Sequence, residues 1–449
     1  MTLVVRPGGG RADRRSRARG AVRSRVYLHI GEPKTGTTFV QQAMWGNRAL
    51  LAAQGVMLPG YGHRDHSRAS RDLRQAVRRA GDPADSWAGE WDVLTGQALR
   101  AGGAAAVISD EVLAACNPPQ ADRAVRALLP AEVHVVLTVR DIASLLPAEW
   151  QESVKCRGTV PWEQWLAGVI DSAPAADRRR RSWFWTVHDT LAILQMWSRH
   201  IPPDHVTVIT VPRQGPPEAL WARFASVLGI DSGGIDVPSA RVNSSLGLAE
   251  AEFLRRMNEA LSDGMPEWFY TRNIKRILAA NVLSARPPQP RLALPPDRQA
   301  WAAEQSEILV TALRDSKYHI VGDLHDLLSL PTSGRYVAPA RLSADQMLDA
   351  AVHAAAALAD HQYLQSCPAR LQPEQPRGIR QKARQLGWAV LNGHRTRRML
   401  GNASHLAPVR RLRVLIWCVL MHPARHRLNP APAGDIDAGL DPGCETRAC

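Results

Sequence analysis

The sequence lacks cysteines at CxxC spacing, long apolar runs and an even distribution of charge along the chain. Its 449 residues include six scattered cysteines, none with the CxxC spacing of a zinc site. We therefore expect free thiols and a reducing, cytoplasmic environment. The longest apolar run, residues 414–421, is far shorter than the roughly 20 residues of a membrane-spanning helix. The basic N-terminal stretch contains no apolar signal core, so we expect no secretion.

The net charge of +14 comes from the two ends of the chain. Residues 6–25 contain eight arginines and one aspartate, and residues 370–427 contain twelve arginines, one lysine and one glutamate. The long segment between them is close to neutral, which argues against a nucleic-acid-binding core. We expect four segments, namely a disordered basic tail (1–24), an α/β domain (25–330), a basic helical extension (331–428) and a disordered tail (429–449).

Short apolar runs, many of them β-branched, alternate with helical patterns. The runs expected to form strands are residues 26–30, 55–60, 104–109, 133–139 and 206–211. Continuous apolar strands separated by helices are typical of a parallel sheet that is covered on both faces. The sequence therefore predicts a three-layer α/β sandwich of the P-loop type, with a central parallel sheet and a helical C-terminal extension. One helix is expected at 183–200 and another at 272–285, while His63 and His66 are expected in a polar loop.

The segment GEPKTGTT connects the first predicted strand to a helix that begins near Thr37. The first amides of a helix have no partners within it and lie at the positive end of the helix dipole, so they attract anions. Gly36 allows the backbone to approach a phosphate, Thr37 and Thr38 are expected to cap the helix and donate hydroxyl bonds, and Lys34 adds a positive charge. Gly31 and Gly36 have Walker A spacing, but Thr37 stands where that motif has lysine.

The displaced lysine is the basis of a family resemblance. The motif Pro33-Lys34-Thr35-Gly36-Thr37-Thr38, after an apolar strand ending His29-Ile30-Gly31, resembles the 5′-phosphosulfate loop of sulfotransferases. These enzymes use 3′-phosphoadenosine 5′-phosphosulfate (PAPS) as co-substrate and need no metal for the transfer. The resemblance implies that the motif binds the phosphosulfate and that Lys34 stabilises charge on the bridging oxygen.

The same family binds the 3′-phosphate with an arginine at a strand end and a serine eight residues later. Arg140 follows the strand at 133–139 and matches that arginine. A guanidinium suits the task because it binds phosphate oxygens in a bidentate manner and keeps its charge. The serine position holds Ala148, whereas Ser144 lies one turn earlier on the same helix face. We therefore predict Ser144 as the substitute.

Sulfuryl transfer also requires a base for the acceptor proton. Glu111 is our first candidate, because a carboxylate at the carboxyl end of a parallel strand faces the ligand crevice. The alternative is that Asp110 and Glu111 begin a helix, where acids stabilise the dipole. His66 and His63 are alternative bases because histidine titrates near neutral pH.

The resemblance covers residues 26–330 and implies a bacterial, PAPS-dependent sulfotransferase that acts on a hydroxyl or amine of a carbohydrate, lipid or small metabolite. One alternative is an ATP-dependent phosphotransferase, and another is a nucleotide-binding protein without catalysis, which Ala148 motivates. Residues 405–421 combine arginines with apolar residues. This pattern predicts peripheral contact with an anionic membrane, or docking on the main domain or on a second subunit.

Overall fold

The computed structural model describes residues 24–75, 87–101, 105–172, 181–237, 245–286, 290–329 and 336–366. The predicted N-terminal tail up to residue 23, the basic stretches of the C-terminal extension and the final segment lie outside these residues. The described residues up to Ala357 belong to one compact unit.

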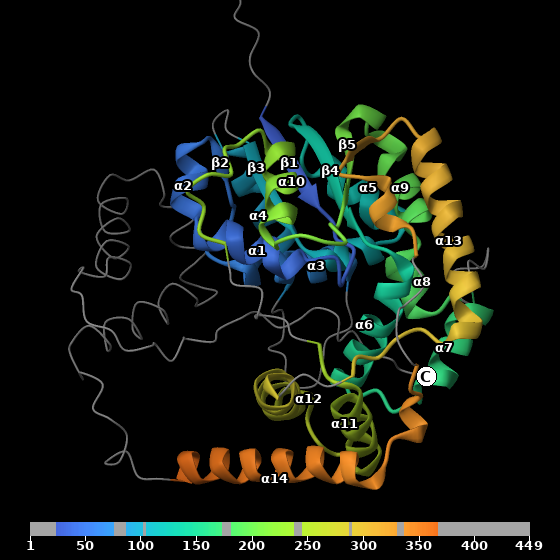
Figure 1. The fold of residues 1–449 in the computed structure, drawn as a ribbon. Helices are drawn as coiled ribbons and strands as arrows, with labels where there is room; N and C mark the ends of the chain where they lie inside the picture. Colours follow the sequence, from blue (N-terminus) through green and yellow to red (C-terminus); the bar gives the residue numbers. More distant parts are fainter. Residues whose placement is uncertain are drawn as a thin grey trace, which may run out of the picture. The chain divides into compact units, whose positions relative to one another are not determined.

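Six parallel strands form the centre of this unit (Figure 1). They are β1 (Arg25–His29), β2 (Val56–Met57), β3 (Ala105–Ser109), β4 (Glu132–Val139), β5 (Val206–Thr210) and β6 (His319–Val321). The strand order is β2-β3-β1-β4-β5-β6. In the register of the three central strands, Leu28 lies opposite Ile108 on one side and Val135 on the other. The predicted parallel sheet is thus confirmed.

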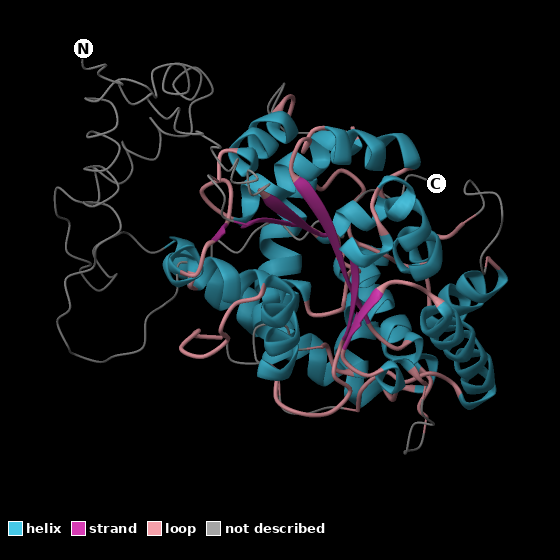
Figure 2. Cartoon of the chain, turned by 90° about the horizontal axis from the view of Figure 1, so that it is seen from above, coloured by secondary structure: helices cyan, strands magenta, loops and turns pink. Residues whose placement is uncertain are grey.

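Helices cover both faces of the sheet, as Figure 2 shows from above. One face carries Val26, Leu28 and Val135 and packs against α3 (His63–Arg74), α4 (Glu90–Leu99), α5 (Pro118–Arg126), α9 (Thr190–Trp197) and α13 (Pro296–Asp315). The other face carries Tyr27 and Val136 and packs against α1 (Thr37–Gly46), α2 (Arg48–Ala53) and α10 (Glu218–Leu228). Alternate strand residues thus enter two separate cores. This is the predicted α/β sandwich.

A further group of helices lies beyond the carboxyl ends of the strands (Figure 1). It contains α6 (Ile142–Lys155), α7 (Trp162–Asp171), α8 (Trp183–His188), α11 (Leu248–Ala260), α12 (Glu267–Phe269) and a π-helical segment, η6 (Tyr270–Val282). Trp150 of α6 is fully buried, stacks edge-on against Trp162, and donates from its indole to the carbonyl of Val160 at 3.0 Å. The alanine-rich helix α14 (Ala344–Ser366) follows later in the chain.

Two local predictions are wrong. The helix expected at 183–200 breaks at Asp189, whose carboxylate accepts a hydrogen bond from the amide of Ala192 and so begins α9. The polar loop expected around His63 and His66 is the helix α3. Its buried face includes His66, Ser70 and Leu73 at helical spacing, but few of its residues are apolar, so the pattern did not indicate a helix.

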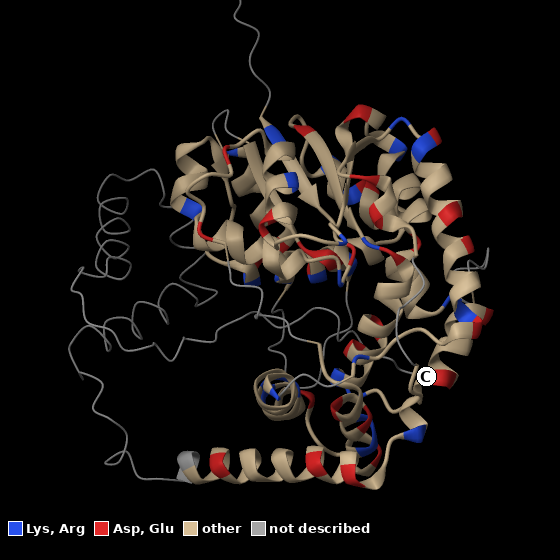
Figure 3. Cartoon of the chain, in the orientation of Figure 1, with Lys and Arg blue, Asp and Glu red and all other residues tan. Residues whose placement is uncertain are grey.

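Acidic and basic residues are interspersed along the described elements (Figure 3). None of the helices in the described ranges is long and apolar enough to cross a membrane.

Candidate functional site

The sheet has a topological switch point at β1, which lies between β3 and β4. In open parallel sheets, ligands bind in the crevice at the carboxyl ends of the strands beside such a point. The loop after β1, Glu111 after β3 and Arg140 after β4 all lie at this edge. The loop also packs closely there, because a Cβ on Gly31 would lie 3.0 Å from Cα of Glu111. The fold therefore gathers the two predicted half-sites and the first candidate base at one edge.

Gly36 fixes the end of the loop. It has a left-handed backbone (φ +85°), and a Cβ there would lie 2.4 Å from a methyl carbon of Leu220 on α10. The left-handed backbone favours glycine here, and a larger residue would also have to displace the Leu220 methyl group. Thr37 and Thr38 occupy the first turn of α1, and no side chain within the described residues caps this helix. The predicted capping by threonine is wrong because Gly36 takes the N-cap position.

Thr35 holds the loop on the sheet. Its hydroxyl donates to the carbonyl of Glu32 at 2.5 Å and lies 2.6 Å from the hydroxyl of Thr138 on β4. Both threonines are buried, and so is Pro33. The Thr35 hydroxyl is therefore engaged within the protein, where it shapes the loop.

Lys34 lies at the tip of the loop with a left-handed backbone (φ +60°), a conformation that costs a non-glycine residue roughly 1–2 kcal/mol. Its Nζ is 2.6 Å from Oε2 of Glu152 on α6. The Nζ of Lys275, from the π-helical segment, is 2.7 Å from Oε1 of the same carboxylate. Glu152 is buried and so holds two ammonium groups beside the loop.

Sequence reasoning missed Lys275, although a signal was present. Only five of the 56 basic residues are lysines, and two of these five share Glu152. A compact ammonium differs from a guanidinium in size and geometry, so lysine in an arginine-rich chain is informative.

A second buried charge network lies beneath the loop. The Nδ1 of His188 is 3.1 Å from Oε2 of Glu32, and its Nε2 is 3.7 Å from Oε2 of Glu149. The hydroxyl of Thr190 donates to the other oxygen of Glu32 at 2.5 Å. Burial alone would lower the pKa of His188, but the two carboxylates outweigh it and raise that pKa to about 9. His188 is therefore an imidazolium at neutral pH that fixes Glu32 next to Lys34.

We expect His188→Gln to lower the free energy of unfolding by about 3–5 kcal/mol, because it leaves two buried carboxylates without their cation. The sign of the pH dependence follows from the raised pKa. The His188 contribution is full below the ordinary pKa of 6.5 and is lost as the pH rises towards 9, a change of about 3 kcal/mol. Urea denaturation across this pH range measures both effects.

The matched control for this experiment is His200→Gln, because His200 is exposed and pairs with Asp122. We expect its stability to follow that of the wild type. A His188→Gln variant with wild-type stability and an unchanged slope between pH 6.5 and 9 would contradict the imidazolium assignment.

The predicted 3′-phosphate half-site lies at the start of α6. Arg140 is half-buried, and its guanidinium has no hydrogen-bond partner among the described residues. Burial lowers the pKa of Arg140. The negative charge of Asp141 raises this pKa and the positive charge of Arg291 lowers it, and the net shift is downward. The guanidinium nevertheless stays charged at neutral pH. Asp141 caps α6 by accepting from the amide of Ser144 at 3.0 Å. The charge of Arg291 thus adds to that of Arg140, which favours an anion at this end of α6.

Glu111 is buried beside the loop. Its Oε2 accepts a hydrogen bond from Nε2 of Gln41 on α1 at 3.0 Å, and the same amide is 3.3 Å from the hydroxyl of Ser109. Gln41 is a second residue that sequence reasoning missed, and it orients the carboxylate. Asp110 begins the short 3₁₀ helix Glu111–Ala115 by accepting from the amide of Val112, as the alternative prediction had it.

The ring of His66 contacts backbone groups on both sides. Its Nδ1 accepts from the amide of Ser109 at 3.1 Å, and its Nε2 is 2.9 Å from the carbonyl of Pro59. Burial and the neighbouring His63 lower the pKa of His66 to about 4. Both ring nitrogens are engaged by backbone groups, so this arrangement does not support the prediction of His66 as a base.

The chain is thus an α/β protein with a parallel sheet and a glycine-containing loop between its first strand and α1. A crystal structure of a sulfotransferase from Alicyclobacillus acidocaldarius is similar over 57% of this chain and 97% of the other, at 17% identity and a TM-score of 0.31. A likeness this weak identifies neither a family nor an activity. No family model and no curated protein matches the chain.

Proposed function

We propose that the chain is a sulfotransferase that moves a sulfuryl group from PAPS to a hydroxyl or amine. The observation that carries this proposal is the pairing of two cationic half-sites along α6. Lys34 meets Glu152 near the end of this helix, and Arg140 precedes its first turn. A nucleotide with a 5′-phosphosulfate and a separate 3′-phosphate needs two such sites. The resemblance of PKTGTT to the phosphosulfate loop assigns the first of them.

In the proposed reaction a lone pair of the acceptor atom forms a bond to sulfur. The bond between sulfur and the bridging phosphate oxygen breaks, and 3′-phosphoadenosine 5′-phosphate leaves with that electron pair. Glu111 takes the acceptor proton, and the Lys34 ammonium offsets the negative charge that develops on the leaving oxygen. Gln41 orients Glu111, while Glu152 positions Lys34 and Lys275. No step requires a metal.

The alternative phosphotransferase finds less support at this site. It would require a carboxylate for Mg²⁺ near the loop, and Asp110 is the candidate by position. One of its oxygens accepts from the amide of Val112, and the charges that act on it belong to Arg71 and Arg74 of α3. Burial raises the pKa of Asp110 to about 6, so the carboxylate is mainly ionised at neutral pH, but Arg71 and Arg74 already offset its negative charge.

Transfer of labelled sulfate from PAPS to a panel of phenols, sugars and lipids tests the proposal. We expect at least one acceptor to be labelled, and the label to disappear in Lys34→Ala. Binding of PAPS without transfer to any acceptor, or slow hydrolysis alone, would favour a nucleotide-binding protein that lacks catalysis.

We expect Arg140→Ala to weaken binding of 3′-phosphoadenosine 5′-phosphate by about 10- to 10²-fold, because charge-assisted bonds to a phosphate contribute roughly 1.5–3 kcal/mol. Binding of 5′-AMP, which lacks the 3′-phosphate, is expected to stay unchanged. Isothermal titration of both nucleotides measures the difference.

Arg314→Ala is the matched control, since Arg314 is exposed on α13. Equal losses for the two nucleotides in Arg140→Ala would place Arg140 outside the 3′-phosphate site.

A further inference from the structure

Three side chains with metal-binding groups meet at the opposite end of the sheet from the loop. Glu132 is the first residue of β4, and His134 follows two positions later on the same face. His205 directly precedes β5, where Val206 pairs with Val135 of β4. Neighbouring strands therefore bring together residues that are about seventy positions apart in sequence.

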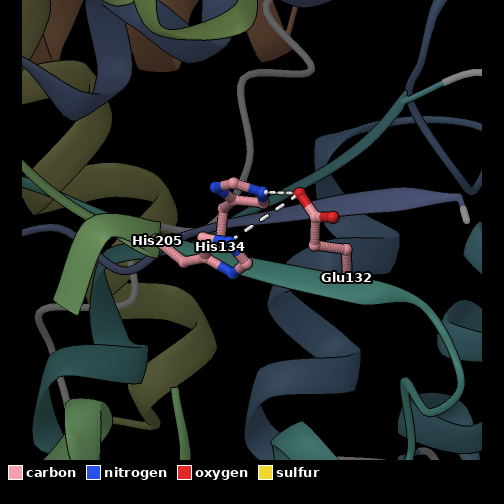
Figure 4. A group of neighbouring side chains, drawn as sticks. All are labelled: Glu132, His134 and His205. Carbon is pink, nitrogen blue, oxygen red and sulfur yellow. Dashed lines mark hydrogen bonds and ion pairs between the residues drawn. The ribbon is translucent and has the colours of Figure 1, made fainter. Parts of the chain in front are cut away.

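The geometry of the cluster suits one ion. The Oε1 of Glu132 is 2.7 Å from Nε2 of His134 and 4.0 Å from Nε2 of His205. One ligand atom from each residue lies within 4.8 Å of the others. Figure 4 shows both interactions converging on one carboxylate oxygen. Tetrahedral coordination with bonds of about 2.0–2.1 Å separates ligand atoms by about 3.3 Å, which lies between the two measured values.

The surroundings leave room for a fourth ligand. The side chains of Glu132, His134 and His205 are 33%, 16% and 25% exposed, so water reaches the cluster. The imidazole of His205 stacks on that of His134, with ring centroids 4.3 Å and planes 22° apart, so one ring must rotate before both nitrogens aim at one ion. The His205 ring has no hydrogen-bond partner in the described part of the chain that would oppose this rotation. Arg25 is 3.5 Å from Glu132 and competes for its carboxylate, but its side chain is 60% exposed and free to turn away.

We infer that Glu132, His134 and His205 bind a divalent transition-metal ion, with Zn²⁺ the best match. Two imidazoles, one carboxylate and one open position form a known zinc donor set. Mg²⁺ and Ca²⁺ prefer oxygen ligands throughout, so the two histidines select against them. The ion joins the start of β4 to the start of β5.

This site is separate from the proposed transfer site. Eight residues of β4 span roughly 23 Å at about 3.3 Å per residue, and Arg140 follows the far end. The bound ion therefore takes no part in sulfuryl transfer. Its expected effect is to stabilise the folded chain by mass action.

Calorimetric titration of the untagged full-length chain with ZnCl₂ tests the inference. We expect one ion per chain, a higher melting temperature, and no response to MgCl₂. His205→Ala and Glu132→Gln are each expected to weaken Zn²⁺ binding by at least about tenfold. Replacing Zn²⁺ with Co²⁺ is expected to give the visible absorption of a four-coordinate site, and His205→Ala to abolish it.

His200→Ala is the matched control, because it removes an exposed histidine that also pairs with a carboxylate. It is expected to bind Zn²⁺ as the wild type does. Circular dichroism without metal checks that each variant is folded. The inference is overturned if Zn²⁺ does not saturate a site, or if His205→Ala and Glu132→Gln bind it with wild-type affinity.

Discussion

Replacing Lys34 with alanine is expected to lower kcat for sulfuryl transfer by about 10²- to 10³-fold. The loss is of this size because a single donor aimed at developing charge in a buried site contributes roughly 3–4 kcal/mol to the transition state. Lys275 does not replace it, since its ammonium lies on the other oxygen of Glu152. Steady-state kinetics with PAPS and the first acceptor found measures the change.

Two further variants test whether the loss of kcat is specific to the Lys34 ammonium. Lys317→Ala removes an exposed lysine elsewhere on the chain and is expected to retain the wild-type kcat. Lys34→Arg keeps the charge but changes the shape of the donor, and we expect only partial rescue. A wild-type kcat for Lys34→Ala, with folding confirmed by its melting curve, would remove Lys34 from the reaction.

Glu111→Gln is expected to reduce kcat by about 10²- to 10⁴-fold, the usual range for loss of a general base. Glutamine has nearly the same shape and still accepts from Gln41, so the fold is expected to persist and nucleotide binding to remain near the wild-type level. A comparison of kcat with the affinity for 3′-phosphoadenosine 5′-phosphate separates chemistry from binding.

The control for this variant is Glu304→Gln, an exposed carboxamide substitution on α13 with an expected wild-type rate. His66→Ala serves as a second comparison. Because both ring nitrogens of His66 are engaged by backbone groups, we expect that variant to lose stability rather than to lose the chemical step selectively. An unchanged rate in Glu111→Gln together with a selective loss of kcat in a folded His66→Ala would reverse the two assignments.

Much of the fold was predictable because most strands are short apolar runs with a helical pattern after them, although β6 was not among the predicted runs. The strands β1, β3, β4 and β5 lie within about one residue of the predicted runs. The break at Asp189 was not predictable in the same way. It depends on a capping carboxylate that also pairs with Arg181, and neither contact alters the apolar pattern of the segment.

The candidate site, like the fold, was predictable only where its residues belong to a local sequence pattern. The loop and Arg140 were identifiable because each belongs to a contiguous motif at a strand end. The network of Glu32, His188 and Glu149 joins Glu32 to residues more than 100 positions away in sequence, so no local pattern could reveal it. Tertiary packing alone creates such contacts.

Thermal stabilisation by 3′-phosphoadenosine 5′-phosphate tests the central claim most directly. The experiment compares this nucleotide with ADP and with ATP–Mg²⁺ on the wild type, Lys34→Ala and Arg140→Ala. A ligand at a hundredfold excess over its dissociation constant stabilises the folded state by about 2.7 kcal/mol. We predict a clear rise in melting temperature with the 3′-phosphorylated nucleotide alone, and a reduced rise in both variants. Stabilisation by ATP–Mg²⁺ alone, or by none of the nucleotides, would contradict the proposed donor site.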